Sequence, residues 1–265
     1  MTERPVVLQI DARGVARITL NRPRLHNAFD DVVIARLSGL LDELAERDGL
    51  RALVLAAEGR SFSAGADLNW MRRMADYSPQ ENRADADRLA GLMRRLDRLP
   101  VPTIARVQGA AFGGGVGLIA CCDMAIASER ARFALSEVRL GIMPAVISPY
   151  VIAAIGPRAA RRWILSGERF DAAEALRIGL LHQVVAEESL DEAVEALLTE
   201  LLACGPRAQA AAKRLIRDVA CRPIDQALID DTAARITELR ASPEGREGLS
   251  AFLEKRPPAW VLDET

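Results

Sequence analysis

Short runs of β-branched and aliphatic residues alternate with longer amphipathic segments through the first half of this 265-residue chain. Val6–Ile10 and Val15–Leu20 predict two paired strands around a turn at residues 11–14. Arg51–Ala56 and Thr103–Val107 predict buried strands, and helical segments separate them from one another. Because helical crossovers between successive strands place those strands side by side in parallel, the alternation predicts an α/β fold.

The helical segments have recognisable boundaries. Asp30 is typical of a residue that caps a helix, here one running to about Arg47. Pro79–Leu99 predicts a charged helix that ends at Pro100. From about Pro157 onward the pattern is almost wholly helical, which indicates a smaller domain or an assembly arm. The helices expected there are Glu187–Ala203, Arg207–Ala220, Ile224–Arg240 and Pro243–Glu254.

Composition limits the function classes. The net charge is −2, so no overall positive field attracts nucleic acid or anionic membrane. No apolar stretch is long enough for a membrane helix, and the first ten residues do not resemble a signal peptide. The four cysteines form no CxxC pair and only His26 and His182 are histidines, so we expect a cytoplasmic protein without a metal site. Carboxylates and backbone dipoles remain as the expected catalytic groups.

Two small-residue segments each follow a predicted strand. Gly59-Arg-Ser-Phe-Ser-Ala-Gly-Ala-Asp-Leu68 offers a backbone that a ligand can approach closely, although a plain glycine turn has the same pattern. Gly113, Gly114 and Gly115 stand before an apolar helical stretch. Glycines at a helix start leave N–H groups uncovered, and the helix dipole adds positive charge there. Such an end stabilises a negative oxygen.

Glu137 lies between Leu135 and Val138 in a mostly apolar stretch. An apolar setting raises the pKa of a carboxyl group and makes it a usable proton carrier near neutral pH. The alternative is a solvated glutamate, or one paired with Arg132 or Arg139. The sequence pattern leaves both interpretations open.

Together these segments resemble the crotonase (enoyl-CoA hydratase/isomerase) superfamily, and the resemblance extends from about Val6 to Trp260. It implies a spiral of ββα units over residues 1–200, a helical trimerisation region over residues 201–265, and a homotrimer or homohexamer. By position, the N–H groups of Ala66 and Gly114 would form an oxyanion hole, and Glu137 matches the proton-donating glutamate. CoA is part of the substrate, so no separate cofactor is expected. The motifs that carry the resemblance also include Asn21-Arg22-Pro23, Asn27-Ala28, Phe62–Leu68, Phe133–Pro144 and Gly248–Arg256. The resemblance implies that CoA contacts Arg24, His26, Ala64, Asp67 and Leu68, together with Phe252 and Lys255 from a neighbouring subunit.

One position departs from the pattern of typical hydratases. They carry a second glutamate one turn into the helix after the glycines, where this chain has Gly117. Glu137 alone favours a double-bond isomerase, whereas the wider resemblance favours a hydratase. The segments Ser61–Met71 and Ser136–Tyr150 look most like bacterial methylglutaconyl-CoA hydratases. One hypothesis reconciles hydratase activity with the absence of a glutamate at position 117. Gly117 leaves room for a distal carboxylate of the substrate, and that carboxylate or Ser148 holds the attacking water.

Two other classes remain as alternatives. The arginine-rich stretch Pro157–Arg162 suggests RNA binding, but the near-neutral charge argues against a nucleic-acid partner. A catalytically silent protein that only binds acyl-CoA is the second alternative, and the presence of Glu137 argues against it.

Overall fold

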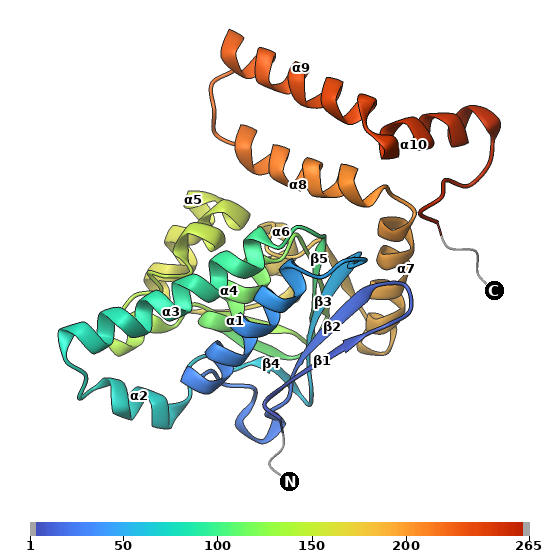
Figure 1. Cartoon of the computed structure of the whole chain (residues 1–265). Coiled ribbons are helices and arrows are strands. Elements are labelled where there is room, and N and C mark those ends of the chain that lie inside the picture. Colours follow the sequence, from blue (N-terminus) through green and yellow to red (C-terminus); the bar gives the residue numbers. More distant parts are fainter. Residues whose placement is uncertain (1–3, 262–265) are drawn as a thin grey trace.

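A computed structural model of the protein describes residues 4–261, which form two β-sheets surrounded by helices (Figure 1). The six-stranded sheet has the order β1-β2-β3-β5-β7-β10, and the four-stranded sheet has the order β4-β6-β8-β9. The larger sheet consists of β1 (Val6–Ile10), β2 (Val15–Leu20), β3 (Ala52–Ala57), β5 (Thr103–Val107), β7 (Met124–Ser128) and β10 (Gln183–Val185). The smaller sheet consists of β4 (Ser61–Ser63), β6 (Ala110–Phe112), β8 (Arg132–Ala134) and β9 (Arg169–Asp171).

The strands expected from the sequence are confirmed. β1 and β2 pair antiparallel around the turn, and β2, β3, β5 and β7 then pair parallel, each with the next. All six residues of β3 are buried, as the uninterrupted apolar run predicts for a strand covered on both faces.

Two helices, α1 (Asp31–Ala45) and α3 (Pro79–Arg98), cover one face of the larger sheet. The helix α4 (Gly114–Cys121) packs against α3 and against β4 and β6 of the smaller sheet. Asp30 caps α1 as predicted, because its side chain accepts a hydrogen bond from the Val33 N–H. Ser78 and Glu81 form a capping box that fixes the start of α3.

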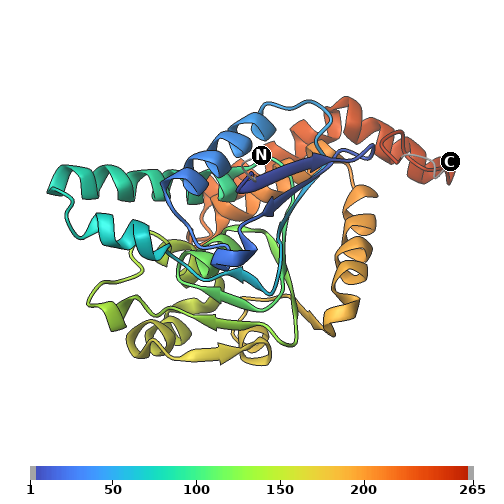
Figure 2. The ribbon, with the colours of Figure 1, turned by 90° about the horizontal axis from the view of Figure 1, so that it is seen from below.

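The opposite face of the sheet is covered by α7 (Leu190–Leu202), and Figure 2 shows α7 across the sheet from α1 and α3. Leu190, Val194 and Leu198 are buried there against β-strand side chains such as Val54 and Ile104. This face of α7 completes the core of its own chain, so most of α7 belongs with the core region of residues 1–200 expected from the sequence.

The smaller sheet places β4, β6 and β8 parallel, with β9 antiparallel at the edge. Between Ser61 and Ser63 the register of β4 shifts by one residue relative to β6, so that Phe62 is an extra, fully buried residue. Phe133 and Phe170 stack inside, with their ring centroids 5.5 Å apart. Two helices, α5 (Ser148–Ser166) and α6 (Ala172–Arg177), flank this sheet.

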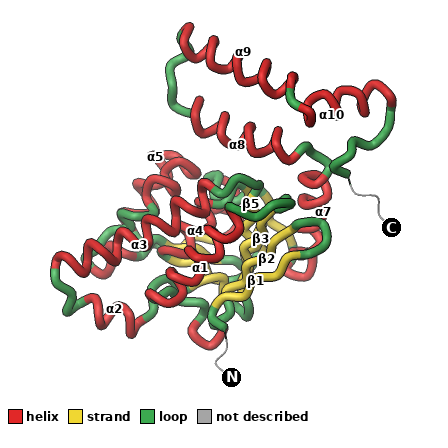
Figure 3. Tube along the Cα trace, in the orientation of Figure 1, coloured by secondary structure: helices red, strands yellow, loops and turns green. Residues whose placement is uncertain are grey.

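The segment after Pro157 is less helical than predicted, because it also contains β9 and β10. Each strand has only three residues, which is too short for a periodic pattern to appear in the sequence. After α7 the chain is helix and loop alone (Figure 3), and α8, α9 and α10 extend away from the sheets (Figure 1). They span Pro206–Val219, Gln226–Ala241 and Pro243–Glu254.

Two further observations apply to the described residues 4–261. None of their helices combines the length and apolarity needed to cross a bilayer. They also contain no cluster of histidine, cysteine and carboxylate side chains that is arranged to hold a metal ion.

Candidate active site

Three segments meet at one edge of the smaller sheet. Residues 64–66 follow β4, residues 113–114 follow β6, and Glu137 follows β8. Because these strands are neighbours and parallel, their carboxyl ends lie together. A β-carbon at Gly65 would lie 3.3 Å from the Phe112 carbonyl oxygen, and one at Gly113 would lie 3.0 Å from Glu137 Oε1. The fold therefore gathers the three segments that the sequence singled out.

Phe29 joins the first two of these segments. Its N–H donates to the Gly65 carbonyl and its carbonyl accepts from the Asp67 N–H, both at 2.7 Å. Ala66 lies between those two hydrogen bonds. The Phe29 ring lies against Gly114, where a β-carbon would approach Cε2 to 2.7 Å. Any side chain at residue 114 would therefore displace this ring. The sequence analysis did not single out Phe29, because nothing distinguishes it from other core aromatics.

Within residues 4–261, neither the Ala66 N–H nor the Gly114 N–H donates a hydrogen bond to another protein group. Gly114 is the first residue of α4, where helical geometry leaves N–H groups free and the helix dipole is positive. Gly113 precedes it with φ of 50° and donates to the Ala134 carbonyl at 2.9 Å, which fixes the turn. Two adjacent loops thus each present a free backbone donor, as an anionic oxygen requires.

Glu137 begins a short 3₁₀ turn that ends at Leu140. Its Oε2 atom is buried and accepts no hydrogen bond from the described residues. Burial raises the pKa of the Glu137 carboxyl above its ordinary value, although its own backbone N–H partly opposes this. In the part of the chain that the structure describes, neither Arg132 nor Arg139 forms an ion pair with it. Among the described residues the carboxyl is therefore free of ion pairs, and its raised pKa suits it to give and take a proton.

The hypothesis that Gly117 leaves room for a substrate carboxylate was wrong. A β-carbon at Gly117 would lie 2.8 Å from Ile147 Cβ, closer still to Ile147 Cγ2, and 3.4 Å from Met93 Cε. Ile147 is buried and fills this space. Ser148, the other suggested partner for water, donates its hydroxyl to the Ala145 carbonyl at 2.8 Å.

The residues predicted to contact CoA near Ala66 differ in how exposed they are and in what they bond to. His26 has φ of 51°, its Nδ1 lies 3.1 Å from Ser61 Oγ, and its carbonyl accepts from the Ala64 N–H at 2.9 Å. Arg24 and Leu68 are exposed, with 70% of Leu68 accessible.

The side chain of Asp67, another expected CoA contact, has a structural role. It caps α2 (Leu68–Met74) by accepting from the N–H groups of Asn69 and Trp70. It also faces Arg22, 3.5 Å away. The buried carboxylate is therefore occupied in holding the start of α2, which leaves only the main chain of Asp67 to meet a ligand.

Phe252 and Lys255 lie at the end of α10, and 80% of Phe252 is exposed. Figure 1 shows α10 far from α2 and from the edge of the smaller sheet. The chain by itself does not bring these two residues to the gathered segments.

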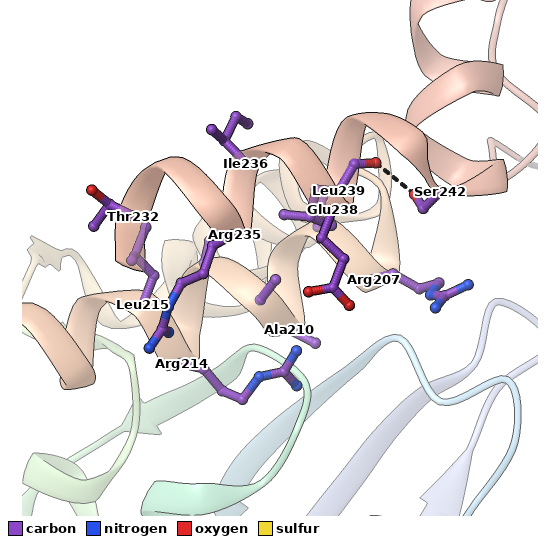
Figure 4. A pocket seen from close by; sticks show the side chains of 13 residues that line it. Arg207, Ala210, Arg214, Leu215, Thr232, Arg235, Ile236, Glu238, Leu239 and Ser242 are labelled. Carbon is purple, nitrogen blue, oxygen red and sulfur yellow. Dashed lines mark hydrogen bonds between the residues drawn. The ribbon is translucent and has the colours of Figure 1, made fainter. Parts of the chain in front are cut away.

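A separate groove of about 680 Å³ runs between α8 and α9 (Figure 4). Its walls combine arginines with apolar side chains, including Arg214, Leu215, Arg235, Ile236 and Leu239. It contains none of the residues that the sequence associated with chemistry. We therefore place the candidate site at the sheet edge and not in this groove.

Comparison with known proteins assigns this arrangement to a family. The profile of the family described as enoyl-CoA hydratase/isomerase matches residues 11–262. The chain belongs to this family. Its fold is the α/β crotonase fold with a helical C-terminal region, as the sequence predicted.

Individual relatives cover almost the whole chain. The crystal structure of an enoyl-CoA hydratase from Shewanella pealeana is 48% identical, with a TM-score of 0.94 over 97% of this chain and 96% of that one. An enoyl-CoA hydratase structure from Mycobacterium smegmatis is 36% identical, with a TM-score of 0.92 over 98% of this chain and 100% of that one. The 2,3-dehydroadipyl-CoA hydratase of Escherichia coli is 34% identical over 92% of this chain and 94% of that protein.

Proposed function

We propose that this family member is an acyl-CoA lyase that adds water across the double bond of a 2-enoyl-CoA. The observation that carries the proposal is the pair of free N–H groups, at Ala66 and Gly114, on adjacent loops beside the Glu137 carboxyl, whose Oε2 atom is buried. Several relatives are named as hydratases, which supports the same activity for this chain.

In this proposal the thioester carbonyl oxygen accepts hydrogen bonds from Ala66 and Gly114. Water adds to C3, and the electrons of the double bond move onto the carbonyl oxygen to give an enolate. The two N–H groups stabilise that negative charge. Protonated Glu137 then delivers its proton to C2, which restores the thioester. The added water loses its second proton to solvent and Glu137 takes one up, so the net reaction adds one water. Burial raises the pKa of Glu137 above its ordinary value, which supports this step because the carboxyl then holds its proton to a higher pH than a solvated glutamate does.

An isomerase is the second candidate, and one observation favours it. Position 117 holds no carboxylate, and Ile147 fills the space that such a side chain would use. Glu137 alone can take a proton from C4 or C2 and return it to the other carbon. A catalytically silent acyl-CoA binder is the third candidate, and the unpaired buried carboxyl of Glu137 argues against it.

The finer assignments are also proposals. We propose 3-methylglutaconyl-CoA as the substrate, on the resemblance of the segments Ser61–Met71 and Ser136–Tyr150. CoA contacts come from Arg24, His26, Ala64, Leu68 and the main chain of Asp67. We propose a homotrimer or homohexamer, in which Phe252 and Lys255 reach the site of a neighbouring subunit. Their exposure at the end of an extended arm supports this arrangement.

A mass-spectrometric screen of the purified protein against crotonyl-CoA, 3-methylglutaconyl-CoA and 3-hexenoyl-CoA tests the proposal. A hydratase adds the mass of water to a 2-enoyl-CoA, whereas an isomerase moves the double bond of 3-hexenoyl-CoA without a change in mass. Glu137→Gln is the matched control, because it keeps size and hydrogen bonding but cannot carry a proton. Its turnover should fall about 10²–10⁴-fold. No reaction with any of the three substrates would support the silent binder.

A further inference from the structure

One buried carboxylate is not used by the proposed mechanism so far. Asp85 lies on α3, and only 9% of its side chain is exposed. Aspartate is rarely buried to this degree unless it is paired or functional. It belongs to the core-facing stripe of α3, where Leu92, Met93 and Leu96 are the other buried residues. Their spacing from Asp85 is seven, eight and eleven positions, so all four lie on one face of the helix.

Met93 shows what this face meets. Its Cε would lie 3.4 Å from a β-carbon at Gly117, and its Sδ lies 3.7 Å from Cys121 Sγ. Met93 therefore packs on α4, the helix that begins at Gly114, while α3 also contacts α1.

The two helices run in the same direction. α3 leads into β5 and α4 leads into β7, and these strands are parallel neighbours. Asp85 precedes Met93 by eight residues, about 12 Å along a helix, while Gly114 precedes Gly117 by three, about 4.5 Å. Measured along the helix axes, Asp85 therefore lies beyond the N-terminus of α4, in the direction in which the free Gly114 N–H points.

The carboxylate of Asp85 is only half satisfied. Its Oδ1 accepts from Arg88 at 2.9 Å, and the Arg88 side chain is half exposed. Its Oδ2 accepts no hydrogen bond from the described residues. Oδ2 is nevertheless accessible to solvent, since it is absent from the fully buried, unpaired polar atoms of residues 4–261. One oxygen of a buried carboxylate is thus open to a small polar ligand such as water.

We propose that Asp85 is the second carboxylate of the site and holds the water that attacks C3; this inference rests on the proposed hydratase function. As the water oxygen bonds to C3, Asp85 Oδ2 takes one of its protons. The double-bond electrons move to the carbonyl oxygen, and Glu137 then protonates C2. Asp85 releases its proton to solvent and Glu137 takes one up, so the net reaction is the addition of one water. Ile147 occupies the place of the missing glutamate, and α3 supplies the carboxylate instead.

Asp85→Asn tests this role in two reactions. Hydration of crotonyl-CoA should lose about 10²–10⁴ in kcat with little change in KM. Exchange of the C2 hydrogens of butyryl-CoA in D₂O needs the oxyanion hole and Glu137 but no attacking water, so its rate should stay unchanged. Asp85→Ser is a second variant that also removes the carboxylate, and its smaller side chain fits the same position. The matched control is Asp87→Asn, an exposed aspartate on the same helix that pairs with Arg83.

The outcomes separate the two proposals. A wild-type protein that hydrates crotonyl-CoA, with an Asp85→Asn variant that hydrates equally fast, overturns the role of Asp85 alone. Loss of both hydration and exchange in both Asp85 variants also overturns it, because it identifies a structural residue. A wild-type protein that shifts double bonds without adding water removes the hydratase proposal, and the role of Asp85 with it.

Discussion

Gly117→Ala measures how tightly Ile147 closes the position at which the resemblance led us to expect a second glutamate. The new β-carbon would lie 2.8 Å from Ile147 Cβ, well inside the ordinary carbon–carbon contact of about 3.5–4.0 Å. Overpacking of a buried site costs about 1–3 kcal/mol. Replacing glycine by alanine inside a helix raises the free energy of unfolding by about 1 kcal/mol. We therefore expect a free energy of unfolding between unchanged and about 2 kcal/mol lower.

Gly39→Ala is the matched control, since Gly39 is also inside a helix and a β-carbon there meets nothing within 4 Å. This variant should gain about 1 kcal/mol. Urea unfolding followed by circular dichroism, at one protein concentration, gives both values. The difference between the two variants is the cost of the clash, about 1–3 kcal/mol. In an Ile147→Ala background, Gly117→Ala should become stabilising. Equal gains from Gly117→Ala and Gly39→Ala in the wild-type background would refute the packing argument.

Three further predictions concern single side chains. Glu137→Gln should be as stable as wild type below the ordinary pKa of a glutamate carboxyl and increasingly more stable as the pH rises above it in thermal melts, because a carboxyl whose pKa is raised in the folded state costs stability once it ionises in the unfolded state. Lys213→Met should lower the free energy of unfolding by about 1.5–3 kcal/mol in urea titrations, since Lys213 Nζ on α8 donates to Asp123 at 2.7 Å. Asp67→Ala should cost about 0.5–2 kcal/mol through the lost cap of α2, seen as an earlier urea midpoint.

Strands and helices with strong local signals were predictable from the sequence. Val6–Ile10 and Val15–Leu20 have the predicted bounds because each is an apolar run ended by a turn. The cap at Asp30 was predictable for the same local reason. β9 and β10 were not, since strands of three residues are defined by the neighbour they pair with.

Within the site, the glycine cluster and Glu137 stood out because their residue types are unusual for their surroundings. The contents of the space beside Gly117 were not predictable, since Ile147 comes from a loop thirty residues later. Asp85 was missed for a related reason. It sits in a charged helix with many acidic neighbours, and only the packing of α3 on α4 distinguishes it from them.

The extra residue at Phe62 acts as a spacer for the proposed oxyanion hole. It lies in β4, only four positions before Ala66, whereas β6 leads directly to Gly114 without such an insertion. One residue advances an extended strand by about 3.3 Å. Removing it would draw the Ala66 N–H back along the sheet by more than the length of a hydrogen bond, while Gly114 stayed in place. The N–H groups of Ala66 and Gly114 would then no longer point at a single oxygen atom. The alignment of the proposed oxyanion hole therefore depends on an inserted residue whose side chain is buried in the core.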